Sequence, residues 1–463
     1  MQKALRITGV IFSKQFKDCA VMVIGRPLSA GLGFFVNMIL ARKLGPEDFG
    51  LYYLAITTMM LTGQFCGGSI AQAVVRFHSH YVTRNPERAA LMFKVALKVI
   101  LAVGGSLSVT GLCLSRPVAE LITGSSASAG SFAFAFVGTL GLSLFQFVLA
   151  VYQAHESFRR HMLLELLNNF LKFVFIGILI AVHGASPTLS VLAYATTPFV
   201  VATIGAFRIP KNFMRATGAE KQVFGELIRF SKWMMLSFVL FSIYGRIDIV
   251  LLNRFKGTTQ GGVYAAATVF TLALEILAFA VFTVILPRVS RLTTPGELRG
   301  YARRILAVTF PLTLLVNLVL LVTLRPLVLS ILSERYAPTI IILRTLIPAS
   351  STFLIALPLT TIIMALNRPR LLAFMDFAVL IAVVGGCAIL IPRFGAPGAA
   401  WAVLGSKLLF LAMVLYFSFA ITTDPPARRG DDPAENGSVP RSSHSYPTTH
   451  SRNVKTCAQS RTL

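Results

Sequence analysis

Two ionisable side chains, Arg246 and Asp248, lie inside an apolar segment in the stretch GRIDIVLLNRFKGTTQGGVY. Inserting a charged group into a membrane costs at least about 2.5 kcal/mol, so such groups usually face a bundle interior or a water-filled cavity. Arg246 precedes Gly257 by eleven residues, which corresponds to about 16 Å along a helix. We therefore expect Arg246 to line a cavity near the middle of the membrane, with a purely structural role as the alternative.

Three carboxylates in apolar segments are candidates for coupling transport to a proton or a sodium ion: Asp248, Glu275 and Asp376. Asp248 lies two positions after Arg246, so the two side chains point to different sides of the helix and cannot pair along it. Either Asp248 titrates during transport or it pairs with a cation on another helix. The other deep charges could alternatively form structural ion pairs, such as Asp376 with Lys407, and the sequence does not choose among these pairings.

The deep cations outnumber the deep anions, which predicts a cavity with a net positive lining. A desolvated guanidinium matches a phosphate group in bidentate geometry, so this lining suits an anionic substrate. Snorkelling is the alternative for Arg26, close helix packing for Asn37, and a wet helix face for Lys172. The candidate substrate-binding residues are Arg26, Asn37, Lys172, Arg246 and Arg344, and Lys407 is a further deep cation.

The elements that must position these residues are membrane helices. The chain has 463 residues, of which 55% are hydrophobic and 13% charged, whereas a soluble domain carries roughly 25% charge. A span needs about 20 apolar residues, and twelve are predicted: 19–41, 51–74, 90–113, 131–152, 162–182, 188–207, 233–253, 262–286, 305–324, 339–365, 371–391 and 398–421. The fold class is therefore an all-α polytopic membrane protein.

The net charge of +25 lies mostly in the short loops, which indicates membrane topology and anionic lipid rather than nucleic acid. With the N-terminus inside, the cytoplasmic segments hold 24 Lys and Arg residues against 8 in the opposite loops. Both termini are therefore predicted to be cytoplasmic. The Pro- and Ser-rich residues 422–463 are predicted to be a disordered tail.

A repeated motif divides the chain into two similar halves. The pattern G-x4-G-x-Y occurs at Gly45–Tyr52 and again at Gly257–Tyr264, 212 positions later, and its glycines Gly45, Gly50, Gly257 and Gly262 are predicted hinges. Each half holds six spans, an even number, so the halves share one orientation and form a parallel repeat. The predicted units are a first lobe at 1–207, a linker at 208–232 and a second lobe at 233–421.

No sequence feature of an enzyme is found. The chain has no Walker-type phosphate loop and no H-E-x-x-H or G-x-S-x-G motif. Its five cysteines are scattered without a C-x-x-C pair, so no metal site is predicted. The protein is therefore expected to be neither an enzyme nor dependent on a cofactor.

Four segments resemble the polysaccharide and O-antigen lipid flippases of the multidrug/oligosaccharidyl-lipid/polysaccharide exporter superfamily: ILARKLGPEDFGLYYLA, AQAVVRF, YGRIDIVLLNRFKGTTQGGVYAAA and LSILSERYAPTIIILR. The resemblance implies twelve helices in two lobes around a V-shaped central cavity. It also implies basic cavity residues, here Arg26 and Arg246.

The expected substrate, by this resemblance, is an undecaprenyl-pyrophosphate-linked oligosaccharide. It would cross from the cytoplasmic to the periplasmic leaflet of a bacterial inner membrane by ion-coupled alternating access, serving O-antigen or exopolysaccharide biosynthesis. Expected partners are this lipid, the membrane lipids and the polysaccharide polymerase machinery, without nucleic acid. The alternatives are an ion-coupled exporter of small molecules from the same superfamily and a membrane glycan polymerase or transferase.

Overall fold

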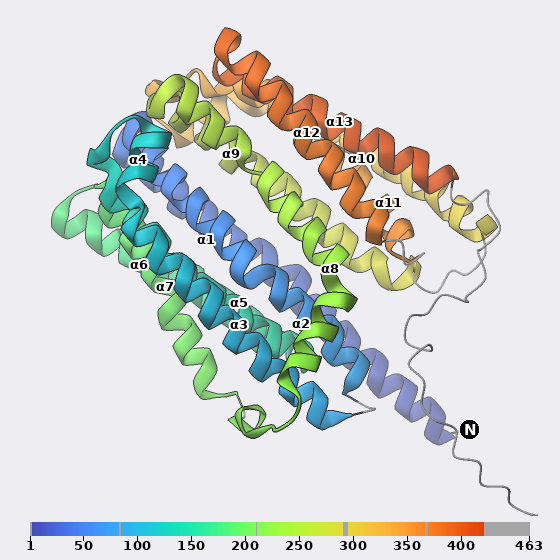
Figure 1. Cartoon of the computed structure of the whole chain (residues 1–463). Coiled ribbons are helices and arrows are strands. Elements are labelled where there is room, and N and C mark those ends of the chain that lie inside the picture. The colour runs from blue at the N-terminus through green and yellow to red at the C-terminus, as the bar shows by residue number, and fades with distance from the viewer. Residues whose placement is uncertain (1, 83–84, 210, 290–294, 366–368, 421–463) are drawn as a thin grey trace, which may run out of the picture. The chain divides into compact units, whose positions relative to one another are not determined.

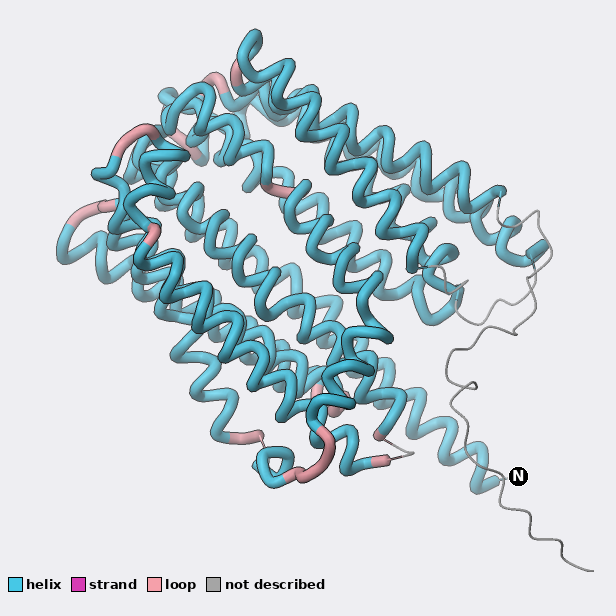
Figure 2. The backbone as a smooth tube through the Cα atoms, in the orientation of Figure 1, coloured by secondary structure: helices cyan, strands magenta, loops and turns pink. Residues whose placement is uncertain are grey.

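The computed structural model describes residues 2–82, 85–209, 211–289, 295–365 and 369–420, so the predicted tail at 422–463 lies outside it. Within these ranges the chain is helical and contains no β-strand (Figure 2). The long helices are α1 (Gln2–Gly63), α2 (Ser69–Tyr81), α3 (Pro86–Cys113), α5 (Ala129–Ala154), α6 (Phe158–His183), α7 (Pro187–Phe207), α8 (Glu220–Tyr244), α9 (Ile247–Val289), α10 (Pro295–Ile331), α11 (Thr339–Ala365), α12 (Pro369–Phe394) and α13 (Ala396–Ala420). A short helix, α4 (Ser115–Thr123), follows α3, and a π-helical turn at Gln64–Gly68 joins α1 to α2.

The predicted all-α membrane fold is confirmed. Ten helical segments in the described part of the chain are long and apolar enough to cross a membrane. Two of them, 25–75 and 235–276, each cover two of the predicted spans. The count of twelve predicted spans and the ten observed segments therefore agree once these two composite segments are divided.

The two composite segments are each broken at a glycine of the repeated motif. Gly45 in α1 and Gly257 in α9 have the same backbone angles, φ 80° and ψ 173°. A residue with a Cβ atom rarely adopts this conformation, because the left-handed side of φ/ψ space is sterically restricted. The repeat in the sequence thus corresponds to a repeat in backbone geometry.

The two halves meet where these broken helices cross. α1 and α9 lie side by side (Figure 1), and their buried residues share one core cluster that includes Tyr52 and Tyr264. The approach is closest at Gly50 and Gly262. A Cβ atom on Gly262 would lie 1.7 Å from the carbonyl oxygen of Pro46, and one on Gly50 would lie 2.0 Å from that of Thr258. Only glycine permits the two backbones to touch here.

Helix α8 contacts both halves. At its start, Val223 and Leu227 are buried in a core cluster made otherwise by residues of the first half. Farther along, Ser237 donates a hydrogen bond to Asp376 of α12 in the second half. Of the predicted linker at 208–232, the residues from Glu220 onward are therefore the beginning of a long helix that bridges the halves.

Ion pairs hold the start of α8 against α3. Glu226 pairs with Arg88, and Glu220 pairs with Lys98 at 2.7 Å and with Lys94 at 3.3 Å. The hydrogen bond from Lys98, together with that from Lys94, holds the pKa of the Glu220 carboxyl below its usual range. These pairs are partly exposed, so each contributes modestly to stability.

Candidate functional site

A cavity of about 420 Å³ lies between the two halves and is lined from both. Its charged lining residues are Arg246, Asp248, Glu275 and Lys407, all from the second half; the first half contributes neutral groups, including Tyr53, Gln64 and Gln146. The Gln146 amide donates to Gln64 Oε1 across 3.3 Å. This bond ties α5 to the turn after α1 and forms part of the cavity wall.

Arg246 lies at a break between two helices. α8 ends at Tyr244 and α9 begins at Ile247, so Arg246 occupies a turn where the sequence predicted a continuous helix. Its side chain is partly buried and lines the cavity, as expected from its depth. Its electrostatic neighbours are Tyr53, Tyr194 and Glu275. Among the described residues, no carboxylate oxygen lies within 4.0 Å of a guanidinium nitrogen of Arg246, so Arg246 forms no ion pair with them.

Asp248 is held by hydrogen-bond donors. Tyr264 donates its hydroxyl to Asp248 Oδ2, and the backbone N–H of Ile249 donates to Oδ1 at 2.8 Å. Asp248 and Tyr264 are both buried. The two roles considered from the sequence were a titrating group and a partner for a cation on another helix. The observed partner is a neutral tyrosine from beyond the Gly257 break.

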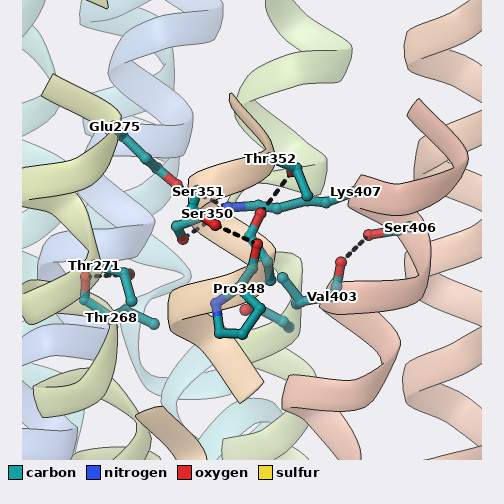
Figure 3. Close-up of polar contacts among 12 residues, drawn as sticks. Thr268, Thr271, Glu275, Pro348, Ser350, Ser351, Thr352, Val403, Ser406 and Lys407 are labelled. Atoms are coloured by element: carbon teal, nitrogen blue, oxygen red, sulfur yellow. Dashed lines mark hydrogen bonds and ion pairs between the residues drawn. The ribbon is translucent and has the colours of Figure 1, made fainter. Parts of the chain in front are cut away.

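Lys407 of α13 and Glu275 of α9 form an ion pair in the cavity (Figure 3). Lys407 Nζ lies 2.8 Å from Glu275 Oε1 and 3.1 Å from Ser350 Oγ of α11. The same ammonium group lies 4.7 Å from the ring centroid of Phe353, within the range of a cation–π contact. The pairing of Asp376 with Lys407 that the sequence left open is therefore not formed.

Asp376 lies outside the cavity lining, between α12 and α8. Ser237 and Tyr244 both donate to its carboxylate, the latter across 3.4 Å. The partners are neutral hydroxyl groups on α8, so the carboxylate serves as a contact between two helices of the second half.

Four of the predicted substrate-binding residues are not among the residues that line the described cavity. Lys172 is buried with its ammonium 3.8 Å from the ring centroid of Tyr194. Asn37 donates to the Gly33 carbonyl of its own helix at 2.8 Å. Arg26 is partly exposed and Arg344 is exposed.

The expected net positive lining is not observed, since the described lining carries two cations and two carboxylates. The reason is geometric. Lys172 of α6 is buried against the Tyr194 ring and Arg344 of α11 is exposed, and neither side chain lines the described cavity. A count of charges along the chain does not reveal which side of a helix faces the cavity.

Three residues of the site, Tyr264, Lys407 and Ser350, were not predicted as parts of it. The sequence identifies Tyr264 only as the end of the repeated motif. It identifies Lys407 as a deep cation but does not place it in the site. The signal for Tyr264 was its repetition at the position of Tyr52. Ser350, which holds Lys407, gives no such signal, because serines are common in apolar helices.

The fold and the site define a polytopic membrane protein whose two six-span halves enclose a cavity that contains four charged side chains. The sequence profile described as "Polysaccharide biosynthesis protein" matches residues 16–293, more than half of the chain. The chain belongs to this family.

Among its relatives is the succinoglycan biosynthesis transport protein ExoT of Rhizobium meliloti (strain 1021), with 24% identity over 282 residues. That match covers 60% of this chain and 54% of ExoT, so the chain spans about half the length of the curated relative it matches.

Solved structures of several membrane transporters share the fold. An inward closed structure of the lipid II flippase MurJ has a TM-score of 0.72 at 14% identity, with 88% of each chain covered. An inward-facing multidrug resistance MATE transporter has a TM-score of 0.71 at 15% identity, covering 87% of this chain and 98% of its own. A MOP superfamily transporter from Pyrococcus furiosus has a TM-score of 0.66 at 15% identity, covering 88% of this chain and 96% of its own.

Proposed function

We propose that this protein is a flippase that carries a polyprenyl-pyrophosphate-linked oligosaccharide from the cytoplasmic to the periplasmic leaflet. Its family takes part in polysaccharide biosynthesis, and a flippase for another lipid-linked sugar shares its fold. The observation that carries the proposal is the position of Arg246. Its guanidinium faces a cavity at the seam between the halves, without a carboxylate partner among the described residues.

In this proposal Arg246 binds the pyrophosphate. A guanidinium presents two parallel N–H groups to a phosphate, and their interaction is strengthened in a partly desolvated site. A volume of about 420 Å³ is within the range of pockets for small ligands, so it suits a pyrophosphate and an adjoining sugar. The rest of the glycan would enter when the halves move apart, and the polyprenyl chain would stay in lipid.

Ion coupling, orientation and partners complete the proposal. Two of the three carboxylates suggested for proton or sodium coupling, Asp248 and Glu275, line the same cavity as Arg246. The excess of Lys and Arg in one set of loops supports an inner-membrane protein with both termini in the cytoplasm. The transported lipid would then reach a polysaccharide polymerase on the periplasmic side.

The test is leaflet transfer of a labelled polyprenyl-pyrophosphate oligosaccharide in liposomes. Wild-type protein should transfer the lipid, and Arg246→Ala should reduce transfer at least tenfold, because it loses a charge-assisted bidentate contact. Arg325→Ala is the matched control, since Arg325 is exposed on α10. Equal transfer by Arg246→Ala and wild type would contradict the role of Arg246.

A small-molecule exporter is the second candidate function. The balance of two cations and two carboxylates in the lining favours it, because an organic cation could be held by Asp248 or Glu275. Under this alternative, folded wild-type protein would transfer no lipid-linked sugar. It would instead show saturable efflux of a cationic dye, and that efflux would be lost in Glu275→Gln.

A further inference from the structure

The ion pair between Glu275 and Lys407 faces the cavity that Arg246 lines. The Lys407 side chain is 14% exposed and that of Glu275 is 31% exposed. Both residues, together with Ser350 and Phe353, line the cavity. An ion pair whose only role is to join two helices needs no access to the cavity. A solute in the cavity can reach this one.

The surroundings of Lys407 form a built site for an oxyanion. Its ammonium group has three N–H donors, which meet a carboxylate oxygen at 2.8 Å and a hydroxyl oxygen at 3.1 Å. The face of the Phe353 ring adds a further favourable contact for the cation. The position occupied by Glu275 Oε1 is therefore one that a phosphate oxygen could occupy instead.

Glu275 also acts on Arg246, because the two interact electrostatically. Glu275 thus lowers the positive potential at both cations that line the cavity, and Asp248 interacts electrostatically with the same two cations. Of these two carboxylates, Glu275 is the one paired directly with Lys407. Because it is part of the chain, Glu275 is always present at a high effective concentration. A phosphate monoester carries about −1.5 to −2 charges near neutral pH, and a diphosphate esterified at both ends carries one negative charge on each of its phosphates. Either group can therefore displace a carboxylate of single charge.

We propose that Lys407 is a second phosphate-binding residue of the cavity and that Glu275 is a built-in competitor that occupies this site until a phosphate or diphosphate group displaces it. This inference rests on the function proposed above for the identity of the natural substrate. The competitor weakens the binding of singly charged anions, which cannot displace it effectively. It thereby selects diphosphates without the need for a more positive cavity.

The proposal predicts that removing the charge of Glu275 increases the affinity of the cavity for phosphate groups. Inorganic pyrophosphate can test this prediction. The full chain is purified in detergent, and its affinity for inorganic pyrophosphate is measured by calorimetry. Glu275→Gln should bind about tenfold tighter than wild type, because the amide keeps the shape but loses the charge. Lys407→Gln should bind more weakly, and the double variant should show no gain over Lys407→Gln alone.

Two further variants separate the proposal from nonspecific effects. Glu120→Gln changes the net charge equally at an exposed position on α4, and should bind like wild type. Glu275→Asp keeps the charge but is one methylene shorter, so it should bind more tightly than wild type and less tightly than Glu275→Gln. If folded Glu275→Gln and Glu275→Asp both bind pyrophosphate no better than wild type, or if the double variant keeps the gain, the proposal is wrong.

The result is independent of the leaflet-transfer experiment. A gain in pyrophosphate affinity without transfer of lipid-linked oligosaccharide would support the competitor and refute the proposed substrate. Transfer by wild type without any gain in Glu275→Gln would support the flippase and overturn the competitor.

Discussion

Two tyrosines at equivalent positions of the repeat permit a sharp test of the site. Tyr264 donates its hydroxyl to buried Asp248, whereas the hydroxyl of Tyr52 has no hydrogen-bond partner among the described residues. Both rings are fully buried. The substitution to phenylalanine removes one oxygen from each position and leaves the packing of the ring intact.

The two substitutions are expected to change the free energy of unfolding in different directions. Tyr264→Phe leaves Asp248 with the Ile249 N–H as its remaining protein donor in the described structure, and a buried acceptor that loses its partner costs about 1–3 kcal/mol, or more when charged. Tyr52→Phe removes a buried polar atom without a partner, so it should be neutral or stabilising. The free energies of unfolding should therefore differ by at least about 1 kcal/mol between the variants.

The assay is reversible unfolding of the two variants in mixed micelles, followed by helical circular dichroism. Asp248→Asn provides the double-mutant cycle, because an amide in place of the carboxylate reduces the cost of losing the tyrosine hydroxyl. Equal destabilisation by Tyr264→Phe and Tyr52→Phe would mean that ring packing alone matters. The assigned role of the Tyr264 hydroxyl would then be refuted.

Two further predictions concern the contact between α1 and α9 and the contact between α8 and α3. Gly262→Ala should destabilise the protein by about 1–3 kcal/mol, because the new Cβ would lie 1.7 Å from a backbone oxygen; Gly385→Ala, with no atom within 4 Å, is the control, and equal unfolding midpoints would contradict the close contact. Lys98 and Lys94 lower the pKa of Glu220 below its ordinary 4.5, so its stabilising effect is present above pH 4.5 and is lost as the pH falls through the lowered value. The unfolding midpoints of wild type and Glu220→Gln should therefore differ at neutral pH and converge in acid, and a constant difference across this range would contradict the ion pairs.

The fold could be predicted from the sequence because its main signals are local. Runs of apolar residues indicate membrane spans, and the motifs that begin at Gly45 and Gly257 mark the same backbone break. The distance from Arg246 to Gly257 also predicted that Arg246 lines a cavity, which it does. These inferences need only the spacing of residues along one or two helices.

The partners within the site could not be predicted, because they depend on how distant helices rotate against one another. Glu275 and Lys407 are 132 positions apart, and several deep acids could equally have met this lysine. The same uncertainty in helix rotation explains why Arg26, Lys172 and Arg344 were expected in the cavity lining. The break before Ile247 was missed as well, since Gly245 and Arg246 lie within an otherwise apolar run.

The contact between Gly50 and Gly262 has the form of an isologous interface, in which each partner presents the same patch to the other. In a dimer of identical subunits, every charge introduced on one side would also appear on the other. Covalent linkage of the two copies removes this constraint: positions equivalent to Arg246 and Asp248, 212 residues earlier, hold Phe34 and Val36. The cavity consequently has one charged wall and one neutral wall, and under the proposed function an asymmetric headgroup would bind in a single orientation.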